Sequence, residues 1–189
     1  MIPAFSAAGV LPPFVGDAAT PKPRSPYAVS ISDVVQRFST SAKRCEILRG
    51  WLSYRAGLHA LGFLDGFQWV DGSFCEQLAT REPNDVDLVT FYVKPTGVDL
   101  AALVASQPEL FSPRLAKPRY LCDVYFVELH GGGHADPALV TYWYSLFSHR
   151  RADLTWKGIL QVPLAPTHDT HALDILTLAT AKLPIPAGP

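Results

Sequence analysis

Apolar residues recur at helical spacing through the first third of the chain and then gather into short runs. The helical spacing predicts one helix from Ser30 or Ser32 to residue 38, and a longer one from Thr40 or Ser41 to about residue 61. The serines and threonine can cap the free amides at each start, and Gly62 is a typical stop signal. On the longer helix a basic set is expected to form a solvated face: Lys43, Arg44, Arg49 and Arg55.

Short apolar runs, rich in β-branched and aromatic residues, predict strands in the rest of the chain. They occupy residues 67–70, 86–93 and 120–129, with a further strand expected at 158–164. Helical patterns occur at residues 99–105, 137–147 and 169–182. This order predicts an α/β or α+β fold in which helices cover one side of a small sheet.

Prolines set the first segment apart. Residues 1–29 contain six prolines, which predict an extended arm lying on its own domain. Residues 30–164 then form the main domain, and residues 165–189 form a C-terminal helix and tail, whose last letters, PIPAGP, are expected to fray.

Composition narrows the class of protein. With 189 residues, 48% of them apolar, the chain can build the core of one decorated domain. The balance of 16 basic and 17 acidic residues provides no overall field that would attract nucleic acid or an anionic membrane. Three separated cysteines indicate reduced thiols, and no window reaches the roughly 18 apolar residues of a membrane span. We therefore expect a cytoplasmic protein with no membrane partner.

The most informative stretch runs from residue 67 to residue 88. A strand ends in Asp71-Gly72-Ser73, where glycine leaves room for a phosphate to approach the backbone. Ser73 is expected to begin a helix, where free amides and the hydroxyl favour an anion. Gly72 and Ser73 are thus candidate nucleotide-binding residues.

Two carboxylates stand at strand spacing shortly afterwards. Asp85 and Asp87 are two residues apart, so both side chains point to one face of the sheet while Val86 points to the other. Two ionised carboxylates at this separation repel each other, and a hard divalent cation relieves the repulsion. The pair therefore predicts a site for Mg2+ (or Mn2+) together with a nucleoside triphosphate.

A third carboxylate and several cations are candidates to complete this site. Asp123 is a charged residue near the start of an apolar strand, where it needs a partner or a metal, and it is the candidate general base or further metal ligand. Lys157, in the basic cluster that follows residue 149, is the candidate phosphate-binding lysine. Lys117 and Arg119 are alternative phosphate partners.

Gly72-Ser73, eleven intervening residues and Asp85-Val86-Asp87-Leu88 resemble the signature of the DNA polymerase beta-like nucleotidyltransferase superfamily. That signature is a Gly-Ser turn, Asp-x-Asp on the next strand and a further Asp on a later one. The wording WVDGSFCEQ and EPNDVDLVTF is also similar to small bacterial proteins of that superfamily. The resemblance implies a small mixed sheet with flanking helices and metal-dependent transfer of a nucleoside monophosphate to a hydroxyl of a protein or RNA. It also suggests a defence or toxin–antitoxin setting.

Other interpretations stay open at this point. Ser73 and Glu76 match a capping box, which would explain both residues without a ligand. Many small members carry Arg or Gly shortly after the Gly-Ser turn, where this chain has Phe74-Cys75-Glu76, so an active site requires Glu76 to point away from a triphosphate. The same fold could also act without turnover, by binding a protein partner. The glycine-rich loop at residues 130–134 carries two histidines and is expected near the mouth of the site.

Overall fold

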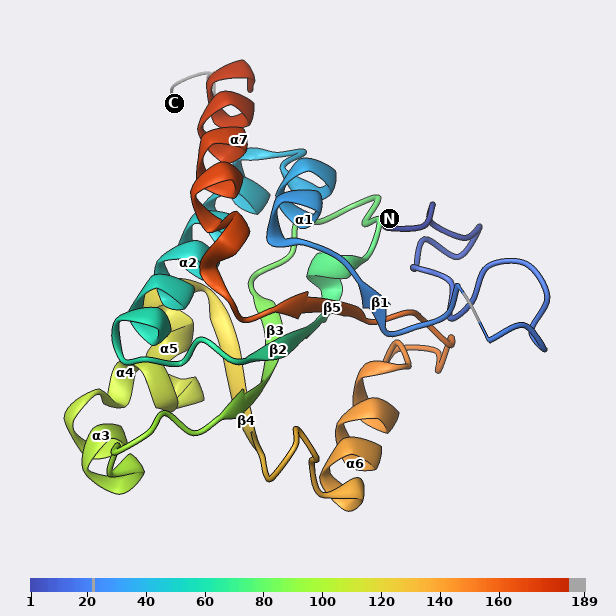
Figure 1. The fold of residues 1–189 in the computed structure, drawn as a ribbon. Helices are drawn as coiled ribbons and strands as arrows, with labels where there is room; N and C mark the ends of the chain where they lie inside the picture. Colours follow the sequence, from blue (N-terminus) through green and yellow to red (C-terminus); the bar gives the residue numbers. More distant parts are fainter. Residues whose placement is uncertain (22, 184–189) are drawn as a thin grey trace.

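The computed structural model describes residues 1–21 and 23–183 and contains one mixed five-stranded sheet. The strands are β1 (Tyr27–Ala28), β2 (Gly66–Asp71), β3 (Val86–Val93), β4 (Cys122–Leu129) and β5 (Leu160–Pro163). Their order across the sheet is β1-β5-β2-β3-β4 (Figure 1). β1 runs parallel to β5 and β3 parallel to β4, while β2 is antiparallel to both of its neighbours. The predicted α+β class with a mixed sheet is confirmed.

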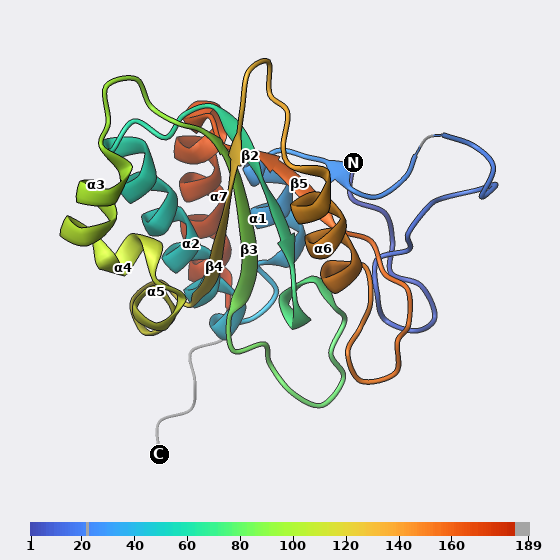
Figure 2. The ribbon, with the colours of Figure 1, turned by 90° about the horizontal axis from the view of Figure 1, so that it is seen from below.

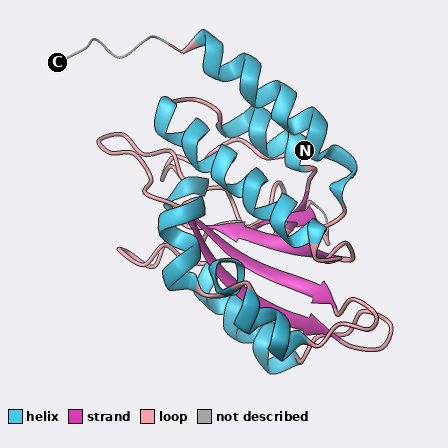
Figure 3. Cartoon of the chain, turned by 90° about the vertical axis from the view of Figure 1, so that its left-hand side faces the viewer, coloured by secondary structure: helices cyan, strands magenta, loops and turns pink. Residues whose placement is uncertain are grey.

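Most helices cover one and the same face of this sheet, which we call its first face. They are α1 (Ile31–Phe38), α2 (Ala42–Ala60), α3 (Leu100–Ser106), α4 (Pro108–Phe111), α5 (Pro113–Tyr120) and α7 (Asp169–Lys182). Figure 3 shows the twisted strands behind these helices. Ser30 caps α1 in a capping box with Asp33, and the Ser41 hydroxyl accepts from the first turn of α2, as the sequence predicts.

The second face of the sheet is covered by α6 (Pro137–Phe147), which stands alone on that side in Figure 2. Trp143 and Phe147 turn inward from this helix and join a separate core cluster with Trp69, Val89 and Phe91. The expectation that helices cover only one side is therefore wrong. The inner strands carry apolar side chains on both faces, so both faces of the sheet must be covered and shielded from water.

Two arginines of α2 correct the prediction of a solvated basic face. Arg55 is fully buried and pairs with Asp169 of α7, with 2.7 Å between its Nε and the Asp169 Oδ2. Arg44 is also buried and donates to the carbonyl oxygens of Phe74 and Glu76 at 2.7 Å each. Both guanidinium groups satisfy polar atoms inside the fold, since a buried charge requires partners.

The first 29 residues are tied into the domain rather than extending from it. Leu11 and Tyr27 belong to the main core, and β1 adds an edge strand to β5. The Gly9 carbonyl accepts from the Gln77 amide at 2.8 Å, and the Leu11 carbonyl accepts from the Gly158 amide at 2.7 Å. We call residues 1–29 the arm; its central part joins segments that lie far apart in the sequence.

The remaining predictions differ mainly in detail. Apart from the helix expected at Ser73, every predicted helix and strand is present with its ends shifted by a few residues at most, whereas β1, α4 and α5 were not predicted. α4 and α5 each start at a proline, at the first helical position, where the missing amide costs nothing. The expected frayed tail, residues 184–189, lies outside the described residues. Of the helices within residues 1–21 and 23–183, none combines the length and apolar content that crossing a bilayer requires.

Candidate functional site

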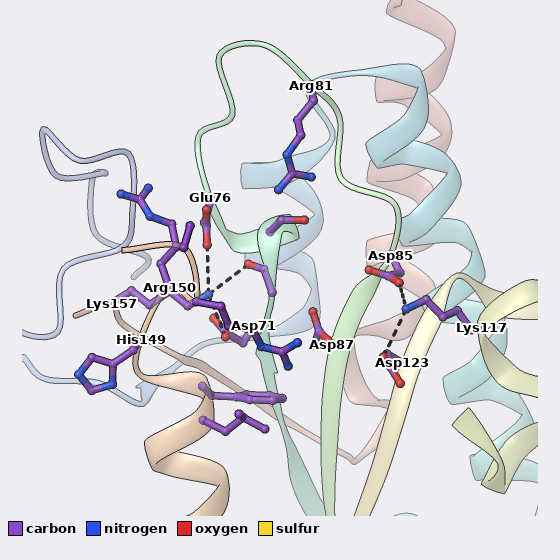
Figure 4. A pocket seen from close by; sticks show the side chains of 16 residues that line it. Asp71, Glu76, Arg81, Asp85, Asp87, Lys117, Asp123, His149, Arg150 and Lys157 are labelled. Atoms are coloured by element: carbon purple, nitrogen blue, oxygen red, sulfur yellow. Dashed lines mark hydrogen bonds and ion pairs between the residues drawn. The ribbon is translucent and has the colours of Figure 1, made fainter. Parts of the chain in front are cut away.

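Carboxylates from three neighbouring strands meet at one edge of the sheet. The end of β2 lies beside the starts of β3 and β4, which places Asp71 opposite Asp87 and Asp87 opposite Asp123. In-register residues share a face, so these three side chains lie on the α6 side, and Asp85, two residues before Asp87, joins them. We call Asp71, Asp85, Asp87 and Asp123 the acidic edge. It forms one wall of a pocket of about 380 Å³ (Figure 4).

Lys117 sits between two of these carboxylates. Its Nζ lies 2.5 Å from Asp85 Oδ2 and 3.3 Å from Asp123 Oδ2, and its side chain is half exposed. Lys117 belongs to the last turn of α5, and Leu121 then adopts a left-handed conformation (φ 56°) that turns the chain directly into β4. The hydrogen bond to Asp85 is the main cause that raises the pKa of Lys117, so the ammonium stays charged.

Asp87 lies in the middle of the acidic edge, between Asp71 of β2 and Asp123 of β4, and its carboxylate packs against Gly72. A Cβ atom at Gly72 would overlap Asp87 Oδ2, and Gly72 has a φ of 84°. Burial raises the pKa of Asp87 to about 6, with further contributions from the neighbouring charges of Asp85 and Asp123. The fold thus holds the Asp87 carboxyl where negative charge is already concentrated.

A buried ion cluster lies on the other side of the pocket, at the end of β2. Lys157 Nζ lies 3.0 Å from Asp71 Oδ2 and 3.2 Å from Glu76 Oε1, and all three side chains are almost fully buried. Burial raises the pKa of Asp71 to about 7, although Lys157 acts in the opposite direction. Burial lowers the pKa of Lys157, but Asp71 and Glu76 outweigh it and raise that pKa above its ordinary value.

Arginines line the pocket opposite the acidic edge. Arg81, from the loop between β2 and β3, extends toward the opening, while Arg150 and Arg151 come from the loop that follows α6 (Figure 4). We call these three residues the basic rim. Arg150 is anchored by Asp153, 2.5 Å away, and by the carbonyl of Ala8 in the arm. The pocket therefore separates an acidic wall from basic groups at its opening.

All six predicted site residues line this one pocket: Gly72, Ser73, Asp85, Asp87, Asp123 and Lys157. The fold brings them together, while their chemical roles remain predictions. Lys157 differs from expectation because its ammonium is occupied by Asp71 and Glu76. Gly72 also differs, because the Asp87 carboxylate fills the space that its missing side chain leaves.

Ser73 requires a larger correction. It starts only a three-residue 3-10 turn, Ser73–Cys75, with no side-chain cap, so neither the expected helix nor the capping box forms. Glu76 instead forms an ion pair with Lys157. Its negative charge is therefore compensated within the protein, and it need not repel a triphosphate. Asp123 lies near the start of β4, whereas the histidine loop at residues 130–134 follows the end of that strand. The loop is therefore not at the mouth of the pocket.

Sequence reasoning missed Asp71 as a site residue and gave Lys117 only a secondary role. Asp71 ends its strand next to a glycine, where an acidic residue is typical of a turn. Its signal lies in the register, since the last residue of β2 faces the Asp-x-Asp of β3. Lys117 follows Pro113 and precedes Pro118, so its helix has little sequence signal.

The acidic edge has the donors for a hard cation but is not arranged as a formed metal site. Within residues 1–21 and 23–183, no three His, Cys, Asp or Glu side chains are grouped as a ready metal site. Asp85, Asp87 and Asp123 nevertheless supply oxygen donors only, the type that Mg2+ and Mn2+ prefer. The Lys117 ammonium now occupies the position of a cation between two of them. The residues fit a divalent ion provided that Lys117 moves aside.

Comparison with known proteins places the chain in a family without an assigned activity. Residues 3–163 match the family of unknown function DUF6932, and because the match spans most of the chain, the chain belongs to this family. No curated protein and no solved structure matches the chain significantly.

Proposed function

We propose that this member of the DUF6932 family is a metal-dependent nucleotidyltransferase, which moves a nucleoside monophosphate from a nucleoside triphosphate to an acceptor hydroxyl. One observation carries the proposal: Asp85, Asp87 and Asp123 meet beside the Gly72-Ser73 turn, and the Lys117 ammonium lies between Asp85 and Asp123. This arrangement is the one that the resemblance to the DNA polymerase beta-like superfamily implies. The cytoplasm, where triphosphates are plentiful, is the expected location.

Asp85, Asp87 and Asp123 would hold Mg2+ (or Mn2+). When bound, the ion would neutralise phosphate charge and polarise the reacting phosphoryl group. A cation between these carboxylates would replace the Lys117 ammonium, which is half exposed and free to turn outward toward the triphosphate. Lys117 would then neutralise a phosphate in place of Asp85 and Asp123.

The remaining groups of the pocket would orient the substrates. Arg81 and Arg151 are exposed at the opening and can approach an anionic triphosphate tail, while the Ser73 hydroxyl can donate to a phosphate oxygen. Asp123 would accept the proton of the acceptor hydroxyl as its oxygen attacks the α-phosphorus. The bond from the α-phosphorus to the bridging oxygen then breaks, and pyrophosphate leaves.

The test is transfer from labelled triphosphates. The wild-type protein, Asp85→Ala and Asp87→Ala are incubated with each ribonucleoside triphosphate and Mg2+, alone and with protein and RNA fractions. We expect labelled product and pyrophosphate from the wild type, and losses on the order of a hundredfold or more in both variants. Asp174→Ala, which removes an exposed carboxylate of α7, is the matched control and should retain full activity.

A second candidate is a binding module with the same fold and no turnover, acting on a protein partner. The ion pairs that occupy Lys117 and Lys157 favour it, because they satisfy the carboxylates without metal. Triphosphate binding without any product would support this candidate. Release of inorganic phosphate instead of pyrophosphate would indicate a phosphohydrolase that uses water as the acceptor.

A further inference from the structure

The buried cluster of Asp71, Glu76 and Lys157 is an unusual way to build the wall of a pocket. The three residues come from the end of β2, the turn after Ser73 and the segment before β5, and each is 5% exposed or less. Two carboxylates face one ammonium, so the cluster retains negative charge when both are ionised. Burying such charges is costly, and apolar residues would serve stability at least as well. The cluster therefore calls for a role besides stability.

One atom of the cluster lacks a partner. Lys157 contacts Oδ2 of Asp71, whereas Oδ1 is buried and has no hydrogen bond of good geometry from the described residues, although the adjacent Gly72 amide lies close enough to the carboxylate to lower its pKa. A buried acceptor without a donor is unfavourable, because it has lost its hydrogen bonds to water without a replacement. Asp71 lines the pocket, so a bound molecule that displaces the atoms covering this oxygen can supply the missing donor.

The surroundings hold this carboxylate in place. Arg44 donates to the carbonyls of Phe74 and Glu76, and the Gln77 amide donates to Gly9 of the arm. These contacts fix the turn that carries Glu76, and Glu76 in turn holds the Lys157 ammonium against Asp71. The unpartnered oxygen is therefore part of a constrained wall.

We propose that Asp71 Oδ1 accepts a hydrogen bond from a hydroxyl group of the bound substrate. A phosphate oxygen is disfavoured there because the ionised carboxylate repels it, and the Lys157 ammonium, 3.0 Å from the same carboxylate, repels a second cation. A neutral donor satisfies both constraints. The inference rests on the proposed function, in which a hydroxyl comes from either the nucleotide sugar or the acceptor.

Nucleotide analogues and Asp71→Ala test this contact. The triphosphate that the wild type binds most tightly with Ca2+ is compared with its 2′-deoxy, 3′-deoxy and 2′,3′-dideoxy forms by calorimetry. If the sugar supplies the hydroxyl, the wild type binds the form lacking it about tenfold more weakly, and Asp71→Ala, which has no hydrogen-bonding group there, removes that difference. If the acceptor supplies it, the wild type binds all four forms equally, and Asp71→Ala raises the KM for the acceptor labelled in the transfer assay about tenfold. Asp174→Ala should match the wild type in both arms.

Two outcomes overturn the proposal in distinguishable ways. A folded Asp71→Ala protein that keeps both nucleotide discrimination and acceptor KM within twofold of wild type refutes the contact alone. A wild-type protein that binds no triphosphate refutes the proposed function, and this inference with it. Should Asp71→Ala fail to fold, a crystal structure of the wild type with triphosphate, Ca2+ and the acceptor decides. A substrate hydroxyl within hydrogen-bond distance of Oδ1 supports the proposal, and a water or metal ion there refutes it.

Discussion

Gly72 shapes the acidic edge through the space that it leaves for a carboxylate. We expect Gly72→Ala to lower the free energy of unfolding by about 2–4 kcal/mol, because alanine at φ 84° is strained and its Cβ would overlap Asp87 Oδ2. Displacing Asp87 should also weaken binding of the metal–triphosphate complex about tenfold or more. Urea unfolding and calorimetry measure the two effects.

Gly97→Ala is the control for this change. Gly97 has a similar φ of 76°, but nothing lies within 4 Å of a Cβ placed there. It should show the backbone strain alone, on the order of 1 kcal/mol, with unchanged ligand affinity. Equal losses of affinity in the two variants would show that Gly72 does not act through Asp87.

The raised pKa of Asp71 gives the stability of the protein a definite pH dependence. An aspartate in an unfolded chain has a pKa of about 4, whereas in the fold the pKa of Asp71 is about 7. The folded state therefore binds more protons between these values, so this residue lowers the stability progressively as pH rises from about 4 to about 7. Asp71→Asn removes the effect. The stability of this variant relative to wild type should increase over that range by up to a few kcal/mol, at about 1.4 per pKa unit, and then level off.

Urea unfolding at a series of pH values measures this difference. Asp153→Asn supplies a contrasting control, since the hydrogen bond from Arg150 holds the pKa of Asp153 below its ordinary value. Asp153 contributes stability that is lost as pH falls, so the sign of its pH dependence is opposite. A relative stability of Asp71→Asn that stays flat between pH 4 and 7 would show that the Asp71 carboxyl is solvated.

The residues of the acidic edge differ in how strong a signal each gives in the sequence, and the difference has a physical reason. Asp87 and Asp123 interrupt apolar strands, and a charge in such a run is by itself a signal of a partner or a ligand. Asp71 gives no such signal, because its importance depends on which residue of β3 it faces. The burial of Lys157 depends likewise on contacts with Asp71 and Glu76, from a distant part of the chain.

At the scale of elements, α2 and α5 approach so closely that a helix glycine is required. A Cβ at Gly50 would overlap the carbonyl oxygen of Tyr120, the last residue of α5. Gly50→Ala should therefore destabilise the fold by about 2–4 kcal/mol, even though alanine favours a helix by about 1 kcal/mol. Because α5 carries Lys117 and leads into Asp123, ligand affinity should fall as well.

Gly57→Ala in the same helix is the matched control. Its Cβ would lie 2.8 Å from Cδ2 of Leu110, the flexible end of a side chain that can move aside. The gain in helix propensity is the same, so the net change should stay within about 1 kcal/mol. Thermal unfolding of both variants measures the contrast, and equal destabilisation would show that the two helices can separate at little cost.

Elements with strong periodicity were predicted, and those defined by context were not. α6, α7 and β3 follow from apolar patterns long enough to specify their type. β1 has only two residues and exists because β5 offers an unpaired edge. α5 contains Pro118, which disfavours a helix interior, and it forms because its last turn packs on α2 and β4. Tertiary contacts decide such segments, and they are absent from the local sequence.

At the scale of the whole molecule, the arm joins the two loops that flank the pocket. Gly9 and Val10 pair with Gln77 and Glu76 on the β2 side. On the other side, Ala8 accepts from Arg150 and Leu11 accepts from Gly158. The arm thus holds the turn that carries Glu76 and the loop that carries Arg150 in one position relative to each other.

This arrangement predicts that destabilising the arm affects the site more than an equal destabilisation elsewhere. Leu11 is 1% exposed and Leu176 of α7 is fully buried, so Leu11→Ala and Leu176→Ala should each cost about 2–5 kcal/mol of unfolding free energy. Only Leu11→Ala should weaken triphosphate binding, severalfold or more, because only Leu11 stands on the segment that joins both loops. Binding is measured at a temperature where both variants are folded, with stability from urea unfolding. Equal losses of affinity in the two variants would mean that the pocket responds to global stability and that the arm has no special hold on it.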